Sequence, residues 1–233
     1  MSITRKMWAA LATLTLCSVS AAATLSVTAA TAATPACGMS CLSIFSKELG
    51  NPQQPGPVED ILDGAATPGQ PVILKQASGS DSSEDTLPRS VGSGLVSDFY
   101  AAGMVSADAN SHFGSLRAVQ IEYAPMGIRS GLCVGLASAR PHENEGLTLQ
   151  PCSVPGVTVF ILDFAVSPAM GYFAIINAAT TDFDHPFAMS LNPDELASDH
   201  QLLQILVRRL QFRADETTVP DSQLWGAHFG PYN

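Results

Sequence analysis

The sequence is poor in basic residues. Its 233 residues contain 11 Lys and Arg against 21 Asp and Glu, which gives a formal net charge of −10. A protein with this charge repels the phosphates of nucleic acids and the anionic surfaces of membranes. We therefore expect no nucleic-acid partner.

The chain also lacks an apolar run long enough to cross a membrane. The run from Met7 to Leu16 has ten residues, whereas a spanning helix needs about 20. It follows Arg5 and Lys6 and precedes small residues with Ala-x-Ala sites, an order typical of a signal peptide. We expect residues 1–33 to be this signal, with cleavage between Ala23 and Ala36. The mature protein is then secreted to the extracellular space and has no membrane span.

Residues 34–233 are expected to form a single domain, because about 200 residues lie within the size range of one hydrophobic core. The signal contains two of the 11 basic residues and none of the acidic ones, so cleavage changes the net charge to −12.

Four cysteines remain after Cys17 leaves with the signal: Cys37, Cys41, Cys133 and Cys152. An even number of cysteines in an oxidising compartment indicates disulfides, and three pairings are possible. We favour Cys37–Cys41 and Cys133–Cys152, because each pair is local and the second brackets an expected hairpin. A zinc site is the alternative, but the 19-residue separation of the second pair is too long for the usual ligand spacing.

Familiar catalytic signatures are absent from the sequence. There is no Gly-x-Ser-x-Gly elbow, His-Glu-x-x-His helix or phosphate-binding glycine loop. Acidic clusters at 81–85 and 182–185 offer oxygen ligands without EF-hand spacing, so we interpret both as solvated loops. We assign no catalytic residue, metal or cofactor, and expect a protein that is not an enzyme.

The remaining sequence has an all-β pattern, with short apolar stretches separated by 18 Gly and 16 Pro. Residues 50–69 and 77–85 are expected to be loops. Residues 91–102 and 193–209 could each carry a helical turn, and we favour a strand for the second. The expected strands are 41–45, 71–76, 116–123, 132–136, 147–151, 157–164, 172–177, 187–191, 201–210 and 223–229.

Short units recur along these strands. Cys41-Leu-Ser-Ile, Cys133-Val-Gly-Leu and Ala188-Met-Ser-Leu are each followed by an alternating strand, and the later units then reach Phe160 and Trp225. Three such units indicate threefold pseudosymmetry.

In these repeats the chain resembles the ricin-type β-trefoil lectins. Repeats of that family contain a disulfide-linked cysteine pair and close with a Gln-x-Trp motif whose aromatic ring packs in the core. Cys133, Cys152 and Phe160 match the second repeat, and Gln223-Leu-Trp225 matches the end of the third. The resemblance implies a β-trefoil with three degenerate repeats and a long insertion in the first; a β-sandwich is the alternative.

Family members that bind galactose-type sugars use an Asp in the opening strand of a repeat. The positions assigned to it here are Ser43, Gly135 and Ser190, and none is a carboxylate. The polar loop of the second repeat offers His142, Glu143 and Glu145 as candidate ligand-binding residues.

These observations favour a secreted, non-catalytic extracellular binding module with a carbohydrate ligand. One alternative is a degenerate trefoil that mediates protein or cell-envelope contacts. Another is a secreted hydrolase whose carboxylates are far apart in sequence. The expected partner is thus an extracellular glycan or protein.

Overall fold

The computed structural model describes residues 37–51, 54, 56–78, 80–167, 169–192, 203–214 and 217–230. The expected signal peptide lies outside these residues. Among the helices in the described ranges, none combines the length and hydropathy that a membrane crossing requires.

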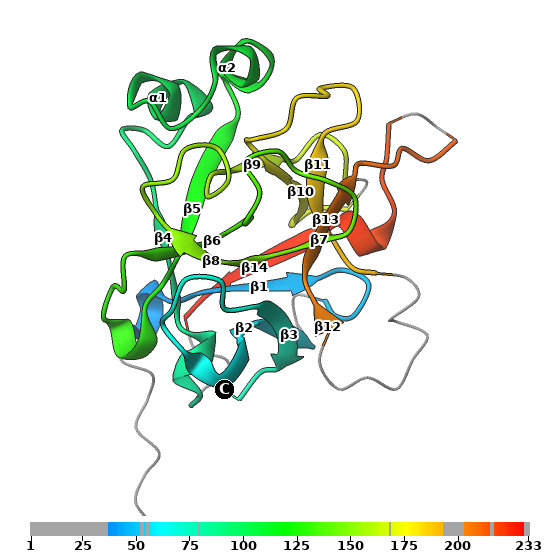
Figure 1. Ribbon diagram of the computed structural model, residues 1–233. Coiled ribbons are helices and arrows are strands. Elements are labelled where there is room, and N and C mark those ends of the chain that lie inside the picture. Colours follow the sequence, from blue (N-terminus) through cyan, green and yellow to red (C-terminus); the bar gives the residue numbers. More distant parts are fainter. Residues whose placement is uncertain are drawn as a thin grey trace, which may run out of the picture. The chain divides into compact units, whose positions relative to one another are not determined.

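Six strands form a closed barrel. Each pairs antiparallel with two others, in the circular order β1, β4, β5, β9, β10, β14 and back to β1. Figure 1 shows β1 and β14 side by side through the middle of the molecule. Their bounds are β1 Leu42–Ser46, β4 Thr86–Arg89, β5 Arg117–Tyr123, β9 Phe160–Asp163, β10 Tyr172–Asn177 and β14 Trp225–Phe229.

Three hairpins cap one end of this barrel, and each is linked to the other two. Strand β12 pairs with β3, β13 pairs with β7, and Pro71 bridges to Thr148. The hairpin strands are β2 Pro57–Ile61 with β3 Val72–Gln76, β6 Leu132–Gly135 with β8 Thr148–Pro151, and β11 Phe187–Ser190 with β13 Leu206–Arg209; the short strands are β7 Glu145–Gly146 and β12 Leu203–Gln204.

The chain thus repeats one pattern three times, over residues 42–89, 117–163 and 172–229. Each unit supplies a barrel strand, a hairpin and a second barrel strand. This is the β-trefoil arrangement that the sequence predicts.

Strands β1 and β10 are buried on both of their faces. On β10, Phe173 and Ile175 join the inner core, whereas Tyr172, Ala174 and Ile176 join an outer apolar cluster. This separation follows from the two-residue period of a strand. Phe160 and Trp225 begin the last strands of their units and are fully buried in the inner core.

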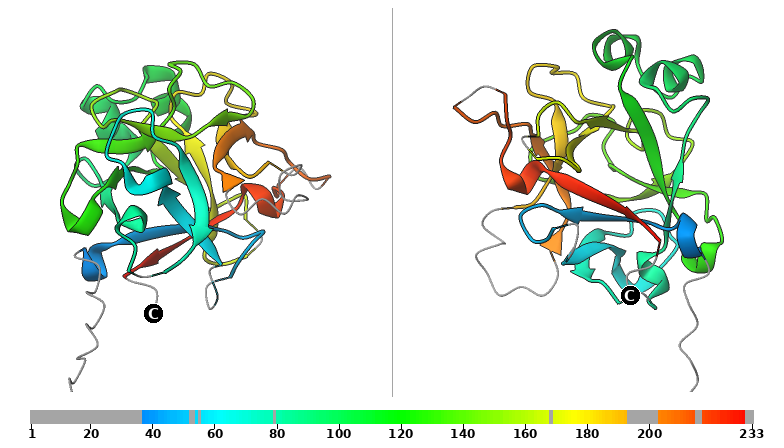
Figure 2. Two further views of the ribbon diagram at one scale, coloured as in Figure 1. Left: turned by 60° about the horizontal axis from the view of Figure 1, so that its bottom comes forward. Right: turned by 180° about the vertical axis from the view of Figure 1, so that it is seen from behind.

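Two helices lie between the first and second units. Helices α1 Val96–Ala101 and α2 Ala107–Phe113 lie beyond the barrel in Figures 1 and 2, and they contribute Val96, Phe99 and Ala109 to the outer cluster. The long insertion that the sequence predicts inside the first repeat therefore lies after the last strand of that repeat.

The opening of the first repeat needs a correction. Cys41 precedes β1, which is a barrel strand because it pairs with β14 along its whole length. Cys133 and Ala188 instead lie on hairpin strands. The corresponding strand of the first unit is β2, within residues 50–69 that the sequence predicts to be a loop.

Candidate functional site

The three hairpins align position by position. Asp60, Gly135 and Ser190 occupy the same place in their units, because each directly precedes a buried aliphatic residue of the inner core. Those core residues are Ile61, Leu136 and Leu191. The expectation that Ser43 holds the first of these positions is wrong, since Ser43 lies on β1 opposite His228 of β14. One of the three positions is thus a carboxylate.

Asp60 borders a cavity of about 450 Å³ on the first hairpin. The hairpin supplies the inner wall, and two short 3-10 turns, Leu62–Gly64 and Ser82–Glu84, supply the rim. The lining residues are Asp60, Leu62, Asp63, Gly64, Ile73, Lys75, Asp81, Ser82 and Ser83.

The Asp60 carboxylate is held in a fixed position. Its side chain is 1% exposed, and Oδ2 accepts a hydrogen bond of 2.7 Å from Ser83 Oγ and lies 3.6 Å from Lys75 Nζ. Burial raises the pKa of Asp60, while the Ser83 hydrogen bond and the Lys75 charge act in the opposite direction. The Asp60 carboxylate is therefore fixed at the inner wall of the cavity by Ser83 and Lys75.

Lys75 and Asp81 form the outer part of the cavity. Lys75 Nζ donates to Asp81 Oδ2 at 2.6 Å, and Asp81 Oδ1 accepts from the Ser83 amide at 3.0 Å. These bonds, led by the one from Lys75, lower the pKa of Asp81 to about 2. The Lys75 side chain is 41% exposed, so its ammonium is available to a ligand oxygen.

The turn after β2 shapes the rim. Asp63 and Gly64 both adopt positive φ, 57° and 63°, which glycine tolerates without steric cost. Tyr123 Oη donates to the Gly64 carbonyl at 2.8 Å and fixes the turn to the barrel. Burial raises the pKa of Tyr123 to about 12, so the phenol stays a donor at physiological pH.

Asp60, Asp81 and Glu84 bring carboxylate oxygens within 4.8 Å of one another, a spacing that could hold a cation. The Lys75 ammonium is already paired with two of these groups. It supplies the positive charge that a metal ion would bring, so the charge balance of the acidic cluster does not require a metal ion.

The equivalent positions in the other units offer no such acceptor. A Cβ at Gly135 would lie 2.8 Å from the Val157 carbonyl oxygen, so the backbone closes this position to a side chain. Ser190 is buried, and its hydroxyl donates to the Leu191 carbonyl.

The residues expected to bind ligand in the second unit lie near one another and contact protein groups. Glu143 accepts from Arg208 Nε at 3.0 Å and from the Arg209 amide. Glu145 accepts from the Ser138 amide and lies 2.9 Å from His142 Nδ1. These contacts tie the loop to its neighbours, and a ligand role for His142, Glu143 and Glu145 stays a prediction.

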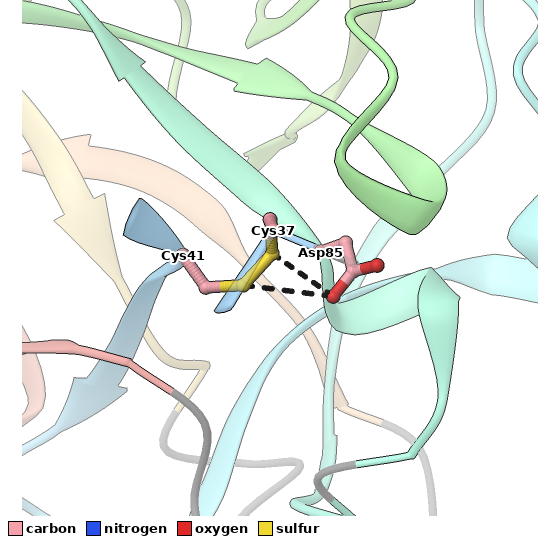
Figure 3. A group of neighbouring side chains, drawn as sticks. All are labelled: Cys37, Cys41 and Asp85. Atoms are coloured by element: carbon pink, nitrogen blue, oxygen red, sulfur yellow. Dashed lines mark hydrogen bonds between the residues drawn. A yellow bond between two sulfur atoms is a disulfide. The ribbon is translucent and has the colours of Figure 1, made fainter. Parts of the chain in front are cut away.

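The cysteines are joined as Cys37–Cys41 and Cys133–Cys152. Figure 3 shows Asp85 beside the first disulfide, with Oδ1 3.3 Å from Cys37 Sγ. A disulfide sulfur carries no proton to donate and is no thiolate ligand, so we interpret this group as a packing contact.

The closing motif of the third unit is structural. Gln223 accepts from the Gln211 amide and donates to the Arg209 carbonyl, while Trp225 Nε1 donates to the Met189 carbonyl at 2.9 Å. In the first unit Thr86 takes the place of Phe160 and Trp225. It pairs with Leu42 of β1 and with Tyr123 of β5, and Phe160 and Trp225 pair with the equivalent positions of their own neighbouring barrel strands.

No family model matches the chain, and no curated protein matches it in sequence. Among solved structures, it is similar to the designed threefold-symmetric protein ThreeFoil, with a TM-score of 0.52 and 12% identity over 80% of this chain and 96% of that one.

Two further solved structures are similar to the chain. An exo-β-1,3-galactanase from Clostridium thermocellum has a TM-score of 0.52 at 13% identity, over 82% of this chain but only 30% of the galactanase. The C-half of an earthworm R-type lectin in complex with GalNAc has a TM-score of 0.43 at 12% identity, over 81% of this chain and 97% of that one. The strand pairing and the match to ThreeFoil establish the β-trefoil fold.

Proposed function

We propose that the protein is a secreted, non-catalytic carbohydrate-binding module that holds its ligand in the Asp60 cavity. The observation that carries this proposal is the buried carboxylate of Asp60 at the position where the ricin-type resemblance implies a sugar-binding Asp. The two disulfides fit the oxidising environment of a secreted protein.

The groups around the cavity suit a polyol. Asp60 and Asp81 can accept from ligand hydroxyls, Lys75 can donate to ring or hydroxyl oxygens, and the Ser83 hydroxyl, whose proton goes to Asp60, can accept. Hydrogen bonds to charged groups contribute about 1.5–3 kcal/mol each, more than bonds between neutral groups. The apolar part of the wall comes from Leu62 and Ile73, so we expect polar contacts to supply most of the affinity.

A glycan array and a polysaccharide pull-down test this function. The mature wild-type protein should be retained by at least one glycan, with galactose-type sugars such as lactose and N-acetylgalactosamine examined first. Asp60→Asn removes the charged acceptor and should weaken binding by tenfold or more. Failure of the wild-type protein to bind any glycan, with a protein partner recovered in its place, would refute the proposal.

Two further variants complete the test. Asp108→Asn makes the same chemical change at an exposed position on α2 and should bind as the wild type does. Lys75→Met removes the outer donor and leaves Asp60 and Asp81 without their cation, so we expect it to weaken binding and to lower the melting temperature, and its binding is measured well below that temperature. Equal binding by all three variants would show that the cavity is not the site.

A further inference from the structure

The open end of the barrel, opposite the hairpins, holds a second cavity of about 190 Å³. At this end β1, β5 and β10 begin and β4, β9 and β14 end. All six strands contribute to the wall, and every lining residue is apolar. The cavity shares no residue with the Asp60 site.

The cavity has a closed floor and an aromatic rim. Ile44, Ile121 and Ile175 are buried and belong to the inner core. Phe164 and Phe229 at the rim are 54% and 56% exposed. Phe164 also packs against Phe173, with ring centroids 4.8 Å apart. A ligand that enters from solvent would therefore meet aromatic rings first and aliphatic side chains below them.

We propose that this barrel-end cavity binds an uncharged apolar group about the size of a phenyl ring. Its lining side chains offer no hydrogen-bond partner, so a polar or charged ligand would lose its bonds to water without replacement. An engineered apolar cavity of about 150 Å³ stays dry and binds benzene, and this cavity is of similar size. The six-stranded wall is formed before binding, so little ordering opposes entry.

The size of the cavity also decides between occupants. A stable contact with a second copy of the chain buries about 1,200–2,000 Å² in total, far more than two half-exposed rings and a recess of this volume can provide. A small apolar molecule, or one apolar group of a larger ligand, fits the observed space.

Benzene is a suitable probe. Titration into methyl-labelled mature protein should shift the methyl signals of Ile44, Ile121 and Ile175 in a saturable manner. Ala227 lies exposed at the mouth of the cavity and pairs with Ile44 across the β1–β14 ladder, so Ala227→Leu narrows the mouth and should weaken benzene binding at least tenfold. The matched change Ala137→Leu, at an exposed position after β6, should leave binding unchanged.

Xenon gives an independent readout on the unmodified chain. Pressurised xenon should shift the same three methyl groups, which keeps the proposal testable if Ala227→Leu does not fold. Absence of shifts with both probes, or equal binding by the two leucine variants, would overturn the proposal. Shifts that follow protein concentration with a rise in apparent mass would also overturn it, because they would assign the rim to self-association.

Discussion

Glu59 is a carboxyl group at an inner-core position. Glu59 directly precedes Asp60. The residues at the equivalent places in the other units are Val134 and Met189, and both belong to the inner core. Among the described residues, neither oxygen of Glu59 has a hydrogen-bond partner. Burial, with a smaller contribution from Asp60, raises its pKa from 4.5 to about 8. The folded protein therefore keeps this carboxyl group protonated at neutral pH.

We predict that stability falls as pH rises because of Glu59. In the unfolded chain the side chain ionises near the ordinary glutamate pKa of 4.5, so its contribution is complete below that pH and is lost as pH rises to about 8. The loss is about 1.4 kcal/mol per pH unit, or a few kcal/mol over the window. Urea unfolding at pH 5, 7 and 9 measures it.

Glu59→Gln should flatten this profile, because the amide does not ionise. Glu48→Gln, at an exposed position in the first unit, serves as the control and should keep the wild-type profile. The account of Glu59 fails if the Glu59→Gln variant and the wild type lose stability equally between pH 5 and pH 9.

At the residue scale, the sequence predicts the buried aromatic residues better than it predicts the site. Phe160 and Trp225 are core residues because large apolar side chains are seldom left in water. The repeat pattern does not single out Asp60, because it aligns the residues after Cys41 with the wrong strand. The dipeptide Asp63-Gly64, a turn signal at the end of a short apolar stretch, is the clue that β2 precedes it.

At the scale of elements, the disulfide Cys133–Cys152 closes the second hairpin. Cys133 lies on β6, opposite Gln150 of β8, and Cys152 follows that strand directly. The bond therefore fixes the register of the two strands in the folded protein and shortens the free chain in the unfolded one.

Replacement of Cys133 and Cys152 by Ser should destabilise the protein by about 3 kcal/mol, from the chain entropy of a loop of about 20 residues. The matched pair Cys37→Ser and Cys41→Ser opens a much shorter loop and should cost about 2 kcal/mol. Denaturant unfolding of the two double variants compares them. A larger loss from the Cys37–Cys41 pair would contradict the entropic explanation.

The elements that the sequence fails to predict have weak local signals. Strand β4 contains Pro88, which has no amide for the ladder, and proline normally argues against a strand. In β2, the acidic pair Glu59 and Asp60 interrupts the apolar stretch. Both strands form because the closed barrel and the hairpin cap supply their partners, which is information that a local pattern does not contain.

Helix α2, in contrast to these strands, has a clear local start signal. Ser106 accepts from the Ala109 amide at 3.1 Å and caps the helix, and Ser at this position is a recognisable start signal. The helical turn expected within residues 91–102 is provided by α1, whereas α2 lies outside every expected element. Its apolar face is short and depends on the outer cluster for burial.

At the scale of the whole molecule, three similar units carry unequal sites. The fold repeats the same hairpin three times, yet the carboxylate stands only in the first, while Gly135 and Ser190 hold the equivalent places. Sequence repeats predict the threefold architecture because core spacing survives in all three units. They do not predict which unit has a carboxylate at this position, because that depends on the backbone around Gly135 and on the partners of Asp60.

The most direct test of this account is a titration of the labelled mature protein with the glycan that the array retains most strongly. We expect saturation at one ligand per chain, with amide shifts concentrated at Asp60, Lys75 and Ser83 and lost in Asp60→Asn. Saturation at three ligands per chain, or shifts centred on Gly135 or Ser190 that persist in Asp60→Asn, would contradict a single Asp60 site.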